Sequence, residues 1–229
     1  MKKLWRSATT TALALGVAVI CGPSPAKAAD TPQYGDELRM VVGSKIPSYD
    51  AHIESTFGMI HPIRPFYSVL MRVNPDNPSS PTDFVCDVCE GGVPKPTEDG
   101  TKFTFKIRND VKFHDGTPLT AHDVKATFDK IVFPPEGIAS NRQAYFKMVE
   151  SITTPDDYTL VFKLKHPSGT FMPSVAMPYN FIYAKKDLDE HGYNWHQKNI
   201  NGSGAFKFVE HVPGSHVKGV KYEGYHHKG

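Results

Sequence analysis

Histidines and aspartates gather in residues 110–131, DVKFHDGTPLTAHDVKATFDKI, and such side chains are the usual material of an active site. General acid–base catalysis or metal binding would require them to converge in one pocket. The local pattern indicates other roles. His114 and Asp115 precede a glycine turn, and Asp123 follows Thr120 by three residues, as in a capping box at a helix start. We therefore interpret these residues as structural, and we predict no catalytic residue and no enzyme activity.

The two cysteines of the segment FVCDVCEGG, Cys86 and Cys89, are a second candidate for chemistry. Two cysteines this close in an oxidising compartment suggest a small-loop disulfide. A redox pair would open a helix, but the EGGVP that follows cannot do so. A zinc site would need a second pair at matching spacing. A structural disulfide or unpaired thiols, half of a zinc site and a redox pair stay open as interpretations.

The histidines, 11 in all, are scattered, and the metalloprotease motif HExxH is absent. His226 and His227 form the only tight pair. Adjacent residues of a strand point to opposite sides, so the pair alone would chelate poorly. The sequence therefore predicts neither a metal site nor a cofactor.

Residues 1–28 have the pattern of a signal peptide. An apolar core at residues 12–20 is too short to span a bilayer, and Ala-Lys-Ala precedes Ala29, the expected mature start. The leader carries four bases and no acid: Lys2, Lys3, Arg6 and Lys27. Without it 22 bases face 24 acids, so no basic surface argues for a nucleic-acid partner. We expect a protein exported to the periplasm.

Strands and helices alternate along the rest of the chain. ELRMVVG, residues 37–43, is typical of a mostly buried strand, and every second residue is apolar in 102–107. Helical spacing follows Thr120, and a hairpin is expected to turn at residues 213–214. This alternation predicts an α/β or α+β fold.

The segment TKFTFKIRNDVKFHDGTPLTAHDVKATFDKI, residues 101–131, resembles the signature of the family 5 extracytoplasmic solute-binding proteins of ABC transporters. That signature joins an aromatic-rich strand, a VKFHDG turn and a PLTAHDV helix start. Other parts agree in order: PFYSVLMRVNPD, which precedes this segment, and NGSGAFKFVEHVPGSHVKGVKYEGYHHKG, which follows it, are similar to family segments. The resemblance covers residues 35–229.

The resemblance implies an α/β fold of the periplasmic binding protein type II-like kind, in which two lobes enclose a ligand. It places a mixed sheet domain at residues 29–50 and 200–229, and an inserted α+β domain at residues 51–199. Family chains are much longer than this one. We therefore interpret the sequence as an N-terminal fragment with the first lobe only, the ligand-closing second lobe being absent.

The resemblance further implies a monomeric receptor that captures a peptide-like solute and delivers it to an ABC permease and ATPase complex. It places ligand contacts at Ser55, Thr56 and Phe57, in the loop after the first strand, and at Tyr145, an aromatic of the helical part. The loop backbone would pair with an extended peptide. Two alternatives stay open: a metal or metal-chelate binding protein, like the nickel-binding members, and a thiol redox protein using the two cysteines.

Overall fold

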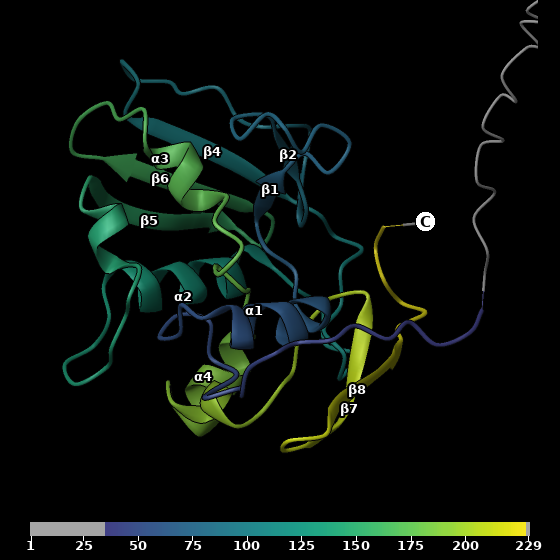
Figure 1. Cartoon of the computed structure of the whole chain (residues 1–229). Coiled ribbons are helices and arrows are strands. Elements are labelled where there is room, and N and C mark those ends of the chain that lie inside the picture. The colour runs from purple at the N-terminus through teal and green to yellow at the C-terminus, as the bar shows by residue number, and fades with distance from the viewer. Residues whose placement is uncertain (1–34, 228–229) are drawn as a thin grey trace, which may run out of the picture. The chain divides into compact units, whose positions relative to one another are not determined.

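A computed structural model describes residues 35–227 of the chain (Figure 1). The chain divides into two compact units, residues 1–40 and 41–229, and the elements below belong to the second. The predicted signal peptide lies outside the described residues. Within those residues, no helix combines the length and the apolar content that crossing a bilayer requires.

Short helices alternate with strands along the second unit. The α-helices are α1 (Phe57–Ile63), α2 (Ala121–Val132), α3 (Phe171–Val175) and α4 (Lys185–His191). The 3₁₀ turns are η1 (Arg64–Phe66), η2 (Gln143–Phe146) and η3 (Trp195–Gln197). The strands are β1 (Met71–Val73), β2 (Phe84–Cys86), β3 (Cys89–Glu90), β4 (Lys102–Ile107), β5 (Val149–Asp156), β6 (Thr159–Leu164), β7 (Phe206–Val212) and β8 (His216–Lys221).

All strand pairs in the described residues are antiparallel. β3, β4, β6 and β5 form a four-stranded sheet in that order, while β1–β2 and β7–β8 are two-stranded ribbons. The β7–β8 ribbon is the predicted hairpin, and Gly214 in its turn has φ of 79°, which glycine adopts without steric cost. The hairpin prediction is confirmed.

One face of the four-stranded sheet carries the larger hydrophobic core. The alternation in β4 buries Phe103, Phe105 and Ile107 and exposes the residues between them, as predicted. α2 and α3 cover this face (Figure 1), since the ring of Phe162 lies 5.1 Å from Phe128 of α2 and 5.2 Å from Phe171 of α3. Edge-on aromatic contacts of this kind add to the burial of apolar area.

The start of α2 follows its sequence signature. Thr120 Oγ1 accepts the His122 N–H at 3.3 Å, and the Asp123 carboxylate accepts the Thr120 N–H at 2.8 Å. This reciprocal capping box satisfies backbone donors that the first turn of a helix leaves free. The helix start predicted at Thr120 is confirmed.

A second hydrophobic cluster lies among α1, the 181–183 segment and the β7–β8 hairpin. Tyr67 stacks on Phe181 with ring centroids 4.7 Å apart, and Phe66 meets Phe208 edge-on at 5.6 Å. Residues 202–204 close this cluster, because the Gly204 N–H donates to the Phe66 carbonyl at 3.0 Å. A Cβ at Gly202 would lie 1.9 Å from that carbonyl oxygen, so only glycine fits there.

The strand predicted at residues 37–43 is wrong for this structure. The segment takes no strand conformation, and the side chains of Leu38 and Val41 are 85% and 96% exposed. A strand is held by hydrogen bonds to a neighbouring strand, and no described strand pairs with this segment. Apolar alternation alone therefore does not fix its conformation.

Candidate functional site

The three loop residues predicted to contact a ligand lie together at the start of α1. Ser55 and Thr56 are exposed and lead into Phe57, whose side chain is 73% exposed. Phe57 stacks on His61 of the same helix, with ring centroids 5.3 Å apart. An exposed aromatic ring backed by a second ring offers an apolar contact surface on a fixed backbone.

Arg142 fastens this loop to the segment before η2. Its guanidinium is buried and donates to Ser55 Oγ at 2.8 Å and to the Glu54 carbonyl. It also lies over the ring of Tyr179, 4.3 Å from its centroid, and the Tyr179 hydroxyl donates to the Ser55 carbonyl at 3.2 Å. Burial lowers the pKa of Arg142, an effect that Tyr179 and other neighbours oppose. The loop is therefore held by a buried cation instead of moving freely.

The fourth predicted residue, Tyr145, lies on the other segment that Arg142 holds. Its N–H donates to the Arg142 carbonyl at 3.0 Å, and its own carbonyl accepts from Ser174 Oγ at 3.2 Å. The ring itself is 55% exposed. The structure thus connects the segments of Ser55 and Tyr145 through one arginine, which sequence reasoning did not identify.

The carbonyls of the loop are already engaged. Those of residues 52–56 accept from Asn141, Arg142, Tyr179 and the first turn of α1. The N–H groups of residues 55–57 have no acceptor within the described residues. Pairing with an extended peptide as an added strand would therefore rest on these N–H groups, because such pairing needs unpaired backbone groups.

A buried ion pair supports the approach to the loop. Lys130 Nζ lies 2.6 Å from the Asp50 carboxylate, and both side chains are at most 1% exposed. The second Asp50 oxygen accepts the His52 N–H and the Tyr183 hydroxyl, each at 2.9 Å. Burial lowers the pKa of Lys130, and the Asp50 carboxylate opposes this shift. Every charge in the network has a partner, which makes its burial tolerable.

The sequence does not indicate the burial of Lys130, because this residue lies outside the apolar stripe that Val124, Phe128 and Ile131 form on α2. That position is covered by a second layer: Tyr183 packs over it, with its ring centroid 4.9 Å from Lys130 Nζ. The periodicity of one helix gives no signal for a second covered face. Asp50 lies in a loop and carries no signal of its own.

The polar residues of segment 110–131 have the structural roles predicted for them. Asp115 accepts the Thr117 N–H at 2.9 Å across the glycine turn, and His114 bonds the Gly204 carbonyl at 3.0 Å. His122 contacts Asp157 at 3.0 Å. Within the described residues these side chains do not converge as a metal-binding group.

An open hollow of about 300 Å³ borders part of this segment. Its lining includes His114, Asp115, Asp187, Asn201 and Lys207. Asn201 donates to Asp187 at 2.8 Å and to Asp115 at 3.3 Å, and Lys207 donates to the His114 carbonyl at 2.9 Å. These polar groups bind one another across the hollow and hold residues 201–207 against the turn.

Cys86 and Cys89 are joined by a disulfide between β2 and β3. Cys89 is buried, and β2 and β3 flank Asp87. The bond thereby holds the short link between the β1–β2 ribbon and the four-stranded sheet.

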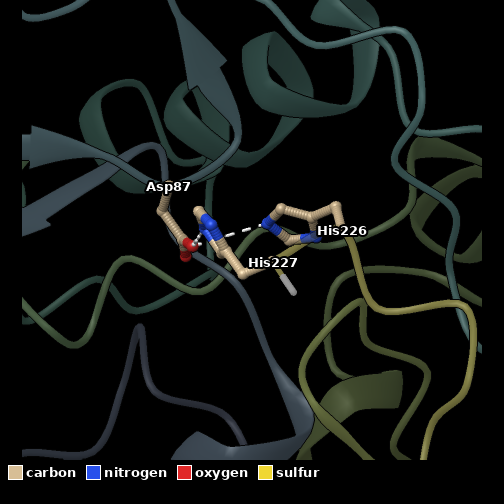
Figure 2. Close-up of side chains that lie close together, drawn as sticks. All are labelled: Asp87, His226 and His227. Atoms are coloured by element: carbon tan, nitrogen blue, oxygen red, sulfur yellow. Dashed lines mark hydrogen bonds and ion pairs between the residues drawn. The ribbon is translucent and has the colours of Figure 1, made fainter. Parts of the chain in front are cut away.

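His226 and His227 do not point to opposite sides, contrary to the prediction. Both imidazoles face the Asp87 carboxylate (Figure 2). The rule of alternating sides holds for strands, and residues 222–227 form turns and bends instead.

Comparison with known proteins places the chain in a family. Residues 85–229, more than half of the sequence, match the model of the bacterial extracellular solute-binding proteins, family 5 (middle region). The chain belongs to this family. The matched residues include the β4 to α2 segment that carried the resemblance in sequence.

Individual relatives of this family 5 protein agree. It is 34% identical over 131 residues to the oligopeptide-binding protein AppA of Bacillus subtilis, covering 54% of this chain and 23% of that protein. It is 29% identical over 214 residues to a putative ABC transporter peptide-binding protein of Brucella ovis, covering 90% and 38%. The chain thus spans less than two-fifths of the length of these relatives.

Solved structures share the fold. The periplasmic binding protein DppA of Helicobacter pylori, in complex with the peptide STSA, superposes with a TM-score of 0.70 at 21% identity, covering 81% of this chain and 39% of that one. Bacillus subtilis AppA in complex with a nonapeptide gives 0.66 at 25% identity, covering 79% and 35%. The predicted α/β fold of the periplasmic binding protein type II-like kind is confirmed.

Proposed function

We propose that this family 5 protein captures a peptide-like solute outside the cytoplasm and delivers it to an ABC permease and ATPase complex, without chemical change to the solute. Family membership over residues 85–229 carries the proposal. Relatives named for peptide binding and solved complexes with peptides support peptide-like cargo.

The ligand contacts are proposed at Ser55, Thr56, Phe57 and Tyr145. The exposed rings of Phe57 and Tyr145 suit apolar contact with peptide side chains, since aromatic side chains provide much contact area at little entropic cost. The loop and η2 are joined through Arg142, so they present these groups with little freedom to lose on binding.

We further propose the division of the first lobe that the family resemblance implies, with residues 29–50 and 200–229 in one domain and 51–199 in the other. The four-stranded sheet lies inside 51–199, and the β7–β8 hairpin lies inside 200–229. The second hydrophobic cluster contains residues of both parts, so the two would unfold together.

Delivery would follow from closure of two lobes on the solute, in a protein that reaches the periplasm through a cleaved signal peptide at residues 1–28. A ligand that contacts both lobes binds the closed state better and shifts the population toward it. The permease would then recognise the closed state. The receptor would act as a monomer.

Calorimetry on the intact protein tests this proposal, after a thermal-shift screen with defined di- to pentapeptides. We expect at least one peptide class to bind, and Phe57→Ala and Tyr145→Ala each to weaken its affinity about tenfold, as loss of an aromatic contact worth about 1.4 kcal/mol would do. Phe133→Ala is the matched control, because Phe133 is also an exposed aromatic but follows α2.

Failure to bind any peptide of the set would contradict peptide capture. Binding that is unchanged in both aromatic variants would keep peptide capture and refute the assigned contacts.

A further inference from the structure

Three side chains with metal-ligating atoms meet at the C-terminal end of the described residues. Asp87, in the link between β2 and β3, faces His226 and His227 from a segment about 140 positions later in the chain (Figure 2). One ligand atom from each lies within 4.8 Å of the other two. This is the one such group of three among the described residues.

The spacing of these atoms is close to that of a metal site. His227 Nε2 lies 2.8 Å from Asp87 Oδ1, and His226 Nε2 lies 3.5 Å from the same oxygen. Ligand atoms about 2.0–2.1 Å from a tetrahedral zinc ion are roughly 3.3 Å apart. Small side-chain rotations would therefore bring the three atoms around one ion.

His226 gives an independent reason to expect a ligand. Its side chain is 1% exposed, and its Nε2 has no hydrogen-bond partner within the described residues. A buried polar atom without a partner is costly, and a water or ion that binds it is one explanation of its presence. This nitrogen is directed at the Asp87 carboxylate (Figure 2).

The surroundings fix the carboxylate in place. Asp87 Oδ2 accepts the Val69 N–H at 2.9 Å, which leaves Oδ1 for the histidines. Burial acts to raise the pKa of the Asp87 carboxyl, but the neighbouring imidazoles of His226 and His227 and the hydrogen bond from the Val69 N–H outweigh it and hold the pKa well below its usual value. The ligand carboxylate is ionised and oriented, as metal sites require.

Arg108 holds the backbone of the segment that carries the two histidines. Its guanidinium donates to the His226 carbonyl at 3.2 Å and pairs with Asp110 at 2.6 Å. The hydrogen bond to Asp110 and the charge of the Asp87 carboxylate raise the pKa of Arg108, so Arg108 is a cation near the site. The Asp110 carboxylate offsets part of the positive charge of Arg108. The Tyr225 ring lies 4.6 Å from that of His226 and 5.5 Å from that of His227, which limits water on that side.

We infer that Asp87, His226 and His227 form a binding site for one divalent transition-metal ion of the zinc type, with water as a fourth ligand. Two imidazoles and one carboxylate favour zinc, nickel or copper over magnesium or calcium, which prefer oxygen. His227, with a side chain 31% exposed, leaves a route to solvent. The ion would fasten residues 222–227 to the β2–β3 link. The inference does not rest on the proposed peptide capture.

The test uses the intact protein without an affinity tag, because a polyhistidine tag would bind the same ions. After treatment with a chelator and dialysis, zinc binding is measured by calorimetry, and cobalt(II) is added as a spectroscopic substitute. We expect one zinc ion per chain, no binding of magnesium, and the strong visible absorption of four-coordinate cobalt.

His227→Gln and His226→Gln are each expected to weaken zinc binding at least tenfold. His216→Gln is the matched control, since His216 is an exposed histidine at the start of β8 and lies 3.4 Å from Glu210. Far-UV circular dichroism establishes that each variant is folded. Should His226→Gln unfold, His227→Gln and Asp87→Asn decide the test.

Two results would overturn the inference. A wild-type protein that binds no zinc would show that the three side chains only contact one another and hold no ion. Zinc binding that survives in His227→Gln but is lost in His216→Gln would place the ion elsewhere.

Discussion

Removing the buried cation Lys130 tests whether its ion pair with Asp50 stabilises the segment that leads into the loop at residues 52–57. Lys130→Met keeps the length of the side chain and a good helix former but removes the charge. The Asp50 carboxylate then stays buried with the His52 N–H and the Tyr183 hydroxyl as donors, and without its counter-ion at 2.6 Å. The protein must either bury this charge or protonate it.

The structure sets the size of the expected loss. Breaking a fully buried ion pair by deleting one partner costs about 3–5 kcal/mol, and both side chains here are at most 1% exposed. For a chain of this size each kcal/mol lowers the melting temperature by roughly 2–4 °C. We therefore expect Lys130→Met to melt roughly 6–20 °C below wild type.

Urea denaturation followed by circular dichroism and tryptophan fluorescence measures the free energy of unfolding. Lys125→Met is the control: the same substitution in the same helix, at a part-exposed residue paired with Asp129 one turn on. Such a surface pair contributes about 0.3–0.5 kcal/mol. In the double variant with Asp50→Asn, the loss should be smaller than the sum of the two single losses, because the partners act as a unit.

A loss below about 1 kcal/mol in the free energy of unfolding of Lys130→Met would refute the reasoning, since leaving the buried Asp50 carboxylate without its counter-ion should destabilise the protein by more than this. Strict additivity in the double variant would show that the two side chains are not coupled and that the loop is held by its other contacts.

Two further perturbations follow from the same structure. Burial, and next the charge of Lys130, lower the pKa of His196 to about 3 from an ordinary 6.5, so the unfolded chain binds the extra proton between these values and stability falls as the pH drops. From pH 6.5 to pH 5 we expect His196 to account for a loss of about 2 kcal/mol in the free energy of unfolding, at about 1.4 kcal/mol per pH unit. His196→Gln should flatten the dependence of this free energy on pH, measured by urea unfolding, whereas the exposed His166→Gln should not. Equal pH dependence in wild type and both variants would contradict this. Gly202→Ala places a Cβ against the Phe66 carbonyl and is expected to lower the free energy of unfolding by at least about 1–3 kcal/mol, measured by thermal melts. Gly169→Ala is the control: a Cβ at Gly169 would have open space around it, so this variant should melt near wild type.

Local signals in the sequence predicted much of the fold. The capping box at Thr120, the alternation in β4 and the turn of the β7–β8 hairpin each depend on residues within one turn or one strand. Such short-range chemistry fixes local conformation wherever it agrees with the packing. The exposure of Phe57 and Tyr145 is likewise compatible with the contacts proposed for them.

Residues whose role depends on partners distant in the sequence could not be predicted from the sequence. Lys130 is buried because Asp50 and Tyr183 meet it from outside its helix. Arg142 holds the loop at residues 52–57 although no residue near it in the sequence indicates this role. His226 and His227 turn to one carboxylate because their segment is not a strand. In each case the deciding contact joins residues at least 50 positions apart.

The second hydrophobic cluster is closed by pairs of very distant residues. The Ser68 hydroxyl donates to the carbonyl of Ser203, 135 positions later, and Tyr49 bonds His211 across 162 positions. During synthesis the N-terminal residue of each pair has no partner until the C-terminal residue has left the ribosome. Contacts between residues so far apart in sequence also form slowly. A chain that folds slowly stays unfolded for longer, and an exported polypeptide passes through a narrow translocation channel in the unfolded state.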